Sequence, residues 1–162
     1  MGSYCNQLKK QVFISPFCPA RLPVHGIVLC LWCGLATAHE YTSPATIKGA
    51  VTIDAEQLID LAGTRTNVVL IDSRIREDHN DGYIEGARHL VDRETSCESL
   101  SGMLPDMQTP VIFYCNGVNC DRSDKAVVIA VGCGYSEVYW FRGGIEEWRA
   151  RKYPLIQYSP VH

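Results

Sequence analysis

The 162-residue chain lacks a strong net charge, a long apolar run and an internal repeat. A formal net charge of only −3 gives no indication of a nucleic-acid partner. The apolar run at residues 27–36 has about 10 residues, too few to span a bilayer comfortably. The sequence also shows no phosphate-binding P-loop and no Ser-His-Asp arrangement. The cysteines are therefore the main candidates for reactive side chains in this sequence.

Acidic residues are missing from the first 38 positions, whose only Lys and Arg residues are Lys9, Lys10 and Arg21. All 18 acidic residues lie in 39–162, together with 12 of the 15 Lys and Arg residues, so that this part has a net charge of about −6. The chain is long enough for one domain, and the charge asymmetry separates its beginning from that domain.

The beginning is typical of a secretory signal peptide, because a cationic region precedes the apolar run and an Ala-Thr-Ala cleavage pattern at 36–38. We therefore predict a signal peptide over 1–38 and a periplasmic or secreted protein with no stable membrane insertion after processing. The alternatives are an anchor formed by an uncleaved N-terminus and a start codon other than Met1. Residues 39–50 are polar, contain a proline and are expected to be a linker.

Export would leave four cysteines in the mature chain, Cys97, Cys115, Cys120 and Cys133. An oxidising compartment permits disulfides, although a sequence does not fix their connectivity. Cys115 and Cys120, five residues apart across a glycine-containing loop, are the favoured pair. A zinc site would need a second ligand pair, so no metal is predicted. Cys97 and Cys133 are expected to be small apolar core residues.

Five β-rich runs alternate with helical segments, which is the pattern of a parallel sheet covered by helices on both faces. A helix over 55–62, capped by Asp54 and ended by Gly63, is expected after the first run. Residues 76–82 are expected to form a polar turn, and 92–110 to be helical or irregular. The expected strands are Val51–Ile53, Asn67–Ile71, 88–91, Val111–Tyr114 and Val138–Phe141.

The run Val111–Tyr114 ends at Cys115, and a polar loop then leads to a helix opened by Ser123 and Asp124. The dipole and the unpaired N–H groups of a helix start favour an anion. A thiolate is such an anion, and it is the nucleophilic form of cysteine. We therefore predict that Cys115 is a nucleophile on an anion-binding loop.

A second polar group, Asp72-Ser73-Arg74, follows the run 67–71. Open α/β sheets place ligands at the carboxyl ends of their strands, which makes Asp72 and Arg74 candidates for a pocket wall. A salt-bridged corner that holds the next segment is the alternative. His79 and His89 are expected to be surface or turn residues rather than bases.

Four stretches, in this order and spacing, together resemble a rhodanese domain. They are NVVLIDSR at 67–74, GYIEGA at 82–87, the active-site strand and loop at 111–123, and YWFRGGIEEW at 139–148. The resemblance covers about 50–157. It implies a three-layer rhodanese-like α/β fold with a mostly parallel five-stranded sheet, a domain over 51–157 and a C-terminal tail over 158–162.

The family resemblance implies a sulfurtransferase without a cofactor. Cys115 matches the cysteine that takes sulfane sulfur from a donor such as thiosulfate, holds it as a persulfide and passes it to cyanide or a thiol. The implied partners are a small sulfur-containing anion and a thiol acceptor, a protein thiol included, and the expected state is a monomer. Arg122 would bind the anionic end of the donor. The loop residues expected to bind substrate are Asn116, Gly117, Val118, Asn119, Asp121, Arg122 and Ser123.

The loop departs from common single-domain rhodaneses, because Cys115 to Arg122 is C-x6-R rather than C-x4-R and contains Cys120. In this it resembles exported bacterial members with two loop cysteines. Cys120 would resolve the oxidised Cys115, silence it in a structural disulfide, or be a bystander. The alternative functions are a thiol–disulfide or oxyanion-reducing protein that uses this pair, a non-catalytic binding module and, with less support, a phosphatase of the C-x5-R type.

Overall fold

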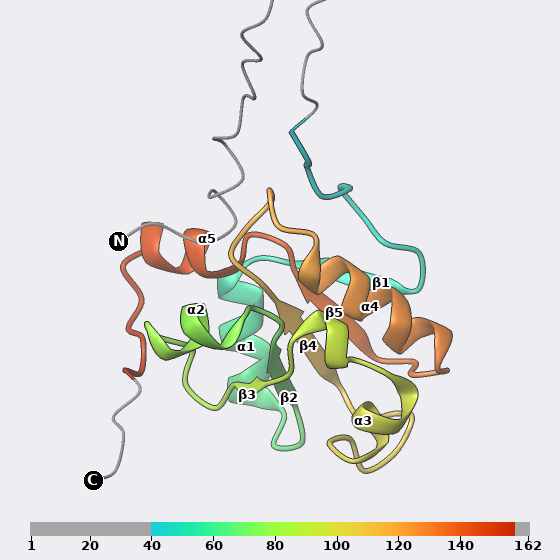
Figure 1. Ribbon diagram of the computed structural model, residues 1–162. Coiled ribbons are helices and arrows are strands. Elements are labelled where there is room, and N and C mark those ends of the chain that lie inside the picture. The colour runs from blue at the N-terminus through green and yellow to red at the C-terminus, as the bar shows by residue number, and fades with distance from the viewer. Residues whose placement is uncertain (1–39, 158–162) are drawn as a thin grey trace, which may run out of the picture.

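The computed structural model describes residues 40–157, and within them five parallel strands form one sheet in the order β1-β5-β4-β2-β3 (Figure 1). The strands are β1 (Ala50–Ile53), β2 (Val69–Asp72), β3 (Arg88–His89), β4 (Val111–Tyr114) and β5 (Val138–Phe141). The α/β prediction is therefore confirmed. The predicted signal peptide (1–38) and C-terminal tail (158–162) lie outside the described residues.

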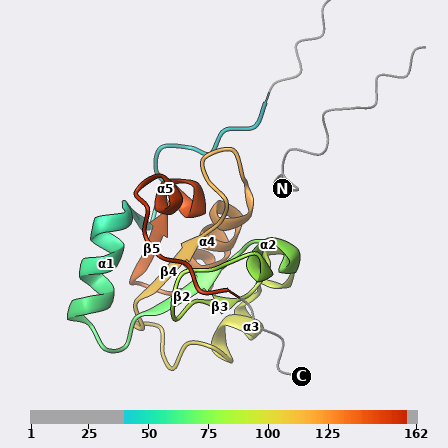
Figure 2. The ribbon, with the colours of Figure 1, turned by 90° about the vertical axis from the view of Figure 1, so that its left-hand side faces the viewer.

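Helices cover both faces of the sheet, with α3 and α4 on one face and α1 and α5 on the other (Figure 2). The helices are α1 (Ala55–Thr64), α2 (Arg76–Asn80), α3 (Cys97–Ser101), α4 (Arg122–Gly132) and α5 (Gly144–Ala150), with a 3-10 turn, η2, at Asp92–Glu94. No helix of the described part is long and apolar enough to cross a membrane.

Strand β4 is the centre of the domain, since β2 and β5 pair with it on either side and each of its residues is buried. Successive side chains of a strand point to opposite faces. Phe113 accordingly packs in the core under α3 and α4, while Ile112 and Tyr114 pack in the core under α1 and α5. A four-residue apolar run can therefore place Cys115 firmly at the edge of the sheet.

The cap of α1 is as expected, but its end is not. The Asp54 carboxylate accepts a hydrogen bond from Gln57 N, and the Gln57 side chain accepts one from Asp54 N, which completes a capping box. Gly63 does not end the helix. Its φ is not in the left-handed region used by glycine caps, and the N–H of Arg65 donates to the carbonyl of Leu61, so that α1 continues to Thr64.

Hydrophobic periodicity does not predict short polar helices, because they have no apolar stripe. The expected turn at 76–82 contains α2, whose sequence REDHN has no apolar stripe. Residues 92–110 contain both η2 and α3. The expected linker also departs from prediction, since Ala50 already belongs to β1 and Ser43 is buried.

Cys97 and Cys133 form a disulfide, with a distance of 5.5 Å between their Cα atoms. The expectation of a small apolar core residue is wrong for Cys97, which is exposed, whereas Cys133 is partly buried and packs against the core. Cys97 is exposed at the start of α3 and Cys133 is the C-terminal cap of α4, so the bond ties two helices on one face of the sheet. Two cysteines 36 residues apart gave no pairing signal in the sequence.

We expect the double substitution of Cys97 and Cys133 by serine to lower the free energy of unfolding by about 2–4 kcal/mol, because it frees a long loop in the unfolded chain. Urea denaturation without reductant measures the change. The matched control replaces Cys115 and Cys120, whose bond closes only five residues and which should therefore lose less chain-entropy stabilisation. A midpoint equal to that of the unmodified chain would show that the helix-to-helix bond does not contribute.

Candidate active site

The loop that follows β4 is closed by a disulfide between Cys115 and Cys120, with their Cα atoms 6.5 Å apart. Within it, Cys120 N donates to the carbonyl of Gly117 in a turn. The predicted pairing is therefore present, and the bystander interpretation of Cys120 is wrong. The two cysteines are only 1% and 2% exposed, so the disulfide is buried.

The start of α5 holds the front of this loop. Ile145 N donates to the carbonyl of Cys115 at 3.0 Å, and Glu146 N donates to that of Asn116 at 2.8 Å. This approach requires a glycine at 144, where φ is +56° and an added Cβ would lie 2.3 Å from Cys115 O. Two N–H groups of the first turn of α5, which have no partner within the helix, thus fix the backbone of Cys115 and Asn116.

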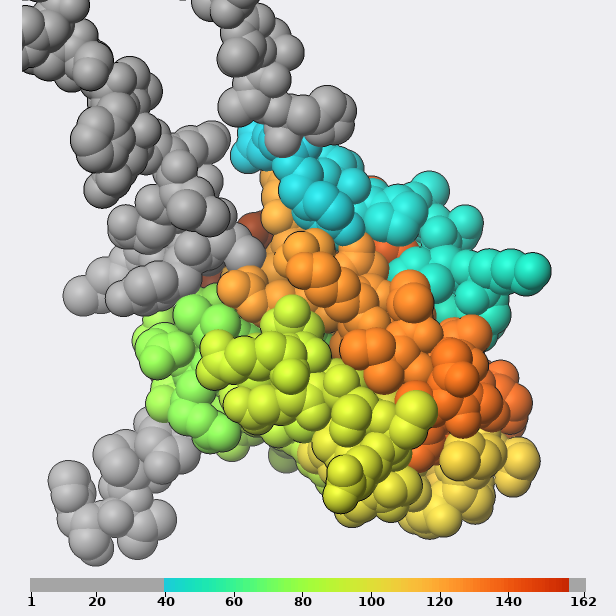
Figure 3. Space-filling model, turned by 45° about the vertical axis from the view of Figure 1, so that its right-hand side comes forward, coloured from blue at the N-terminus to red at the C-terminus, as the bar shows by residue number. Residues whose placement is uncertain are grey.

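The segment 40–45, here called the strap, lies against the same loop (Figure 3). Ser43 N donates to the carbonyl of Val118 at 2.7 Å, and its hydroxyl donates to that of Cys120 at 3.2 Å. From the end of β5, the Arg142 guanidinium donates to the carbonyls of Ser43 and Pro44 at 2.8 and 2.7 Å. The expected linker is therefore part of the site, and nothing in its composition announced this.

Positive charge lies on the Cys120 side of the loop. The Arg122 Nη1 donates to Cys120 Sγ at 3.4 Å, and its Nε lies 3.6 Å from a carboxylate oxygen of Asp92. Arg122 is also the first residue of α4, whose dipole adds a partial positive charge at the same place. A thiolate, a persulfide or a donor anion would be stabilised here.

The other predicted binding residues divide into two groups. Within residues 40–157, the N–H groups of Gly117, Val118 and Asn119 donate to no backbone carbonyl, which makes them candidates for binding an anion. The Glu146 carboxylate lies beside Gly117, at 2.3 Å from the position of an added Cβ, and an anion bound there would meet its charge. The side chains of Asp121 and Ser123 are engaged within the protein instead. Asp121 pairs with Lys125 at 2.5 Å, and the buried Ser123 hydroxyl accepts a hydrogen bond from Trp140 Nε1 at 3.0 Å.

Asp72 and Arg74 form the salt-bridged corner rather than an exposed pocket wall. Their side chains are 0% and 1% exposed, with Arg74 Nη2 2.6 Å from Asp72 Oδ2. Arg74 also donates to the carbonyls of Asp78 and Gly82, which fastens α2 and the turn after it. Side chains so enclosed cannot line an open pocket. Asp72 and Arg74 instead stabilise the structure around the loop.

Two residues extend this corner toward the loop. The Tyr114 hydroxyl donates to Asp72 at 2.9 Å, and Ser73 N donates to the carbonyl of Tyr114. On the other side, Asn116 Nδ2 donates to the buried Asp78 at 2.8 Å. The residues on both sides of Cys115 are therefore tied to the corner, a connection that sequence reasoning missed.

The histidines are part of the corner as well, contrary to expectation. His79 Nδ1 lies 2.8 Å from Asp72 Oδ2, and its ring stacks on Tyr83 with a centroid distance of 4.3 Å. His89 Nε2 lies 2.9 Å from the carbonyl of Arg74. Burial lowers the pKa of His89, an effect that the Arg74 carbonyl opposes in part. Both rings support the structure and lie outside the loop.

Burial would raise the pKa of Asp72, but hydrogen bonds from His79 and Arg74 outweigh it and lower the pKa to about 2. The ionised carboxylate therefore stabilises the fold at every pH above its normal pKa near 3.8. This stabilisation, about 2 kcal/mol, is lost as the pH falls through 4 toward 2.

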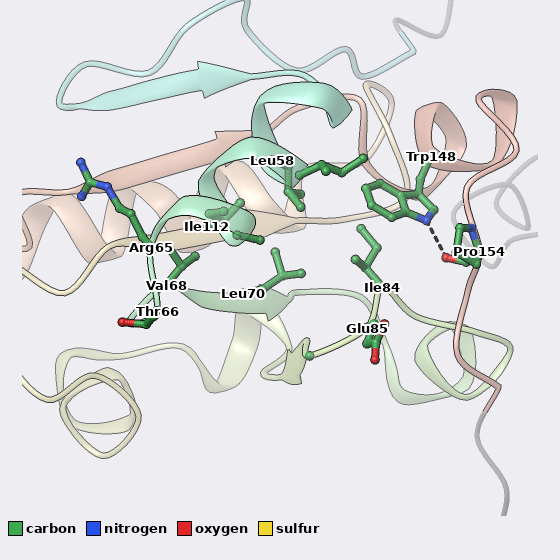
Figure 4. A pocket seen from close by; sticks show the side chains of 13 residues that line it. Leu58, Arg65, Thr66, Val68, Leu70, Ile84, Glu85, Ile112, Trp148 and Pro154 are labelled. Carbon is green, nitrogen blue, oxygen red and sulfur yellow. Dashed lines mark hydrogen bonds between the residues drawn. The ribbon is translucent and has the colours of Figure 1, made fainter.

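The cavity drawn in Figure 4 is separate from the loop. It has a volume of about 370 Å³ and apolar walls that include Leu58, Leu70, Ile112 and Trp148. The Trp148 indole points toward the Pro154 carbonyl and donates to it at 2.8 Å. None of the loop residues lines this cavity. No cluster of three or more His, Cys, Asp or Glu side chains within 40–157 is placed to hold a metal ion.

A cysteine directly after a central parallel strand, held between two helix starts, matches a known class. The model of the rhodanese-like domain family matches residues 54–151. The chain belongs to the rhodanese-like domain family.

Two relatives differ in how much of the chain they resemble. Thiosulfate sulfurtransferase GlpE of Pseudomonas putida (strain GB-1) is 35% identical over 98 residues, which are 60% of this chain and 84% of that protein. The uncharacterized protein YibN of Escherichia coli (strain K12) is 24% identical over 138 residues, which are 82% of this chain and 92% of that protein.

Solved structures agree on the fold. A thiosulfate sulfurtransferase from Pseudomonas aeruginosa has a TM-score of 0.56 at 20% identity, over 67% of this chain and 20% of that one. The polysulfide-sulfur transferase homodimer of Wolinella succinogenes has a TM-score of 0.56 at 19% identity, over 70% of this chain and 83% of that one.

The substitution Asp72→Asn should lower the free energy of unfolding by about 3–5 kcal/mol, because it leaves Arg74 buried without its counter-charge. The unmodified chain should also lose stability between pH 4 and 2, and the variant should lack this part of the loss. Urea midpoints across that pH range measure both effects. Glu94→Gln is the control, since Glu94 pairs with Arg93 in the open and should cost less than about 1 kcal/mol. Identical pH profiles for Asp72→Asn and the unmodified chain would contradict the assignment.

The substitution Gly144→Ala should destabilise the domain by about 1–3 kcal/mol, because alanine disfavours this φ and its methyl group meets the Cys115 carbonyl. Gly63→Ala is the matched control. Gly63 lies within α1 with no atom near its added Cβ, and alanine there should stabilise by about 0.5–1 kcal/mol. Thermal unfolding of both variants measures the contrast, and equal shifts would count against a special role for Gly144.

Proposed function

We propose that this protein is a sulfurtransferase in which Cys115 takes sulfane sulfur from a donor such as thiosulfate and holds it as a persulfide. The observation that carries the proposal is the position of Cys115, directly after the central strand and in the loop between β4 and α4. Family membership and the relatives named as thiosulfate sulfurtransferases support it.

The chemistry begins with reduction of the Cys115–Cys120 bond by a dithiol, which is itself oxidised to a disulfide, because a cysteine attacks sulfur as its thiolate. The Cys115 thiolate attacks the outer sulfur of thiosulfate, the sulfur–sulfur bond of the donor breaks, and sulfite leaves with the bonding pair. The N–H groups of Gly117, Val118 and Asn119, with Arg122, are positioned to hold the anions on both sides of this step. A thiol or cyanide then attacks the terminal sulfur and restores Cys115.

We also propose that the chain acts as a monomer in the periplasm or outside the cell. The two disulfides between described cysteines support this compartment, because such bonds persist where the surroundings are oxidising.

A thiol–disulfide or oxyanion-reducing function is the second candidate, and the bonded pair in the loop favours it. Such a protein would exchange disulfides with a partner at a measurable reduction potential and lose this activity with either loop cysteine. It would not take sulfur from thiosulfate. A non-catalytic binding module is disfavoured, because it would have no use for the reactive cysteine of the loop.

The proposed function predicts one sulfite released for each reduced chain on mixing with thiosulfate. Reductant is removed before mixing, and sulfite is measured directly. Cys115→Ser should abolish the release, because it removes the nucleophile. The double substitution of Cys97 and Cys133 by serine is the control and should keep it, since that bond joins the start of α3 to the end of α4 and involves no residue of the loop. If the reduced chain releases no sulfite from thiosulfate and no leaving group from other sulfane donors, the proposal is contradicted.

A further inference from the structure

The structure places two sulfur atoms in bonding contact at the site where, under the proposed function, a persulfide would form. A persulfide on Cys115 can be relieved in two ways. An external acceptor can take its terminal sulfur, or a second thiol within the loop can attack its inner sulfur. The observations on Cys120 distinguish between these routes.

Access favours the internal route. Cys115 is 1% exposed, with α5 on one side of its loop and the strap on the other. A protein thiol would need the loop to open before it could attack. Cys120 needs no such motion, because the native loop already brings its Sγ to Cys115 Sγ. An attack within one folded loop has an effective concentration that no external thiol reaches.

Charge favours it too. Arg122 Nη1 donates to Cys120 Sγ at 3.4 Å, and α4 begins two residues after Cys120. A cation and a helix start next to a sulfur favour its thiolate, which is the attacking form. Both groups are thus placed to favour the Cys120 thiolate, the form that a second nucleophile requires.

We propose, on the basis of the proposed function, that Cys120 is the resolving residue of the site and turns bound sulfane sulfur into hydrogen sulfide. The Cys120 thiolate attacks Cys115 Sγ, the bond between Cys115 Sγ and the terminal sulfur breaks, and the terminal sulfur leaves as HS⁻. The sulfane sulfur gains two electrons, and the two cysteines lose two electrons as they form their disulfide.

A dithiol reductant then restores the site. Its first thiolate attacks the Cys115–Cys120 bond to give a mixed disulfide, and its second thiol releases the reduced pair. Over one cycle, thiosulfate and a dithiol become sulfite, hydrogen sulfide and the oxidised dithiol. The disulfide of this structure is the state between sulfide release and reduction, which makes the sulfur-transfer and disulfide chemistries two halves of one cycle.

A single turnover without reductant tests this. The reduced full-length chain is freed of reductant and mixed with one equivalent of thiosulfate, and sulfite, sulfide and the peptide that contains residues 115–122 are measured. We expect about one sulfide per chain and a Cys115–Cys120 disulfide. Cys120→Ser should release sulfite but no sulfide, and its peptide should gain about 32 Da, the mass of one sulfur atom bound to Cys115.

The controls separate this inference from the proposed function. Cys120→Ala must behave like Cys120→Ser, which excludes a role for the introduced hydroxyl, and circular dichroism checks that both variants fold. Sulfite release with a stable persulfide in the unmodified chain, equal to that in Cys120→Ser, would overturn the resolving role and leave the sulfurtransferase intact. No sulfite and no persulfide in any of these chains would overturn both.

Discussion

The site depends on two hydrogen bonds from the first turn of α5 to the carbonyls of Cys115 and Asn116. They join the end of the central strand to a helix more than twenty-five residues further along the chain, and they exist only because Gly144 has no side chain. The buried Asp72–Arg74 pair acts beneath them, since Tyr114 and Asn116 are both tied to that corner. The cysteine is thus held by its neighbours on both sides, which leaves its sulfur as the one part of the residue able to change partner.

Six residues separate Cys115 from Arg122, and the conformation of this loop shows what they do. A turn from Gly117 to Cys120 folds the loop back on itself, and this fold brings the second cysteine to the first. Within residues 40–157, the N–H groups of Gly117, Val118 and Asn119 in this turn donate to no backbone carbonyl. One loop therefore combines an anion cradle with a sulfur pair, which is the combination that the proposed cycle requires.

The sequence was sufficient for the strands, the two-sided arrangement and the position of Cys115 directly after the central strand, because buried parallel strands are continuous apolar runs and the motifs at 67–74 and 111–123 have a fixed order. It was not sufficient for α2, whose residues are polar all round, or for the bond between Cys97 and Cys133, which depends on how α3 meets α4. The role of Asp72 also lay beyond it. A charged residue at a strand end has the same sequence pattern whether it binds a ligand or supports the fold. Only its burial in the structure shows that Asp72 supports the fold.

The strap determines on which side of the domain a fused neighbour would stand. Its hydrogen bonds hold the chain around Ser43 against the carbonyls of Val118 and Cys120, so that the described part of the chain begins next to the disulfide loop. The other end is elsewhere, since Ile156 pairs with Tyr83 beside α2 (Figure 1). A bulky group joined at the front of the domain would crowd the route to the cysteines, whereas the same group joined after Gln157 would leave it open. Preparations of the domain tagged at its two ends are therefore not equivalent.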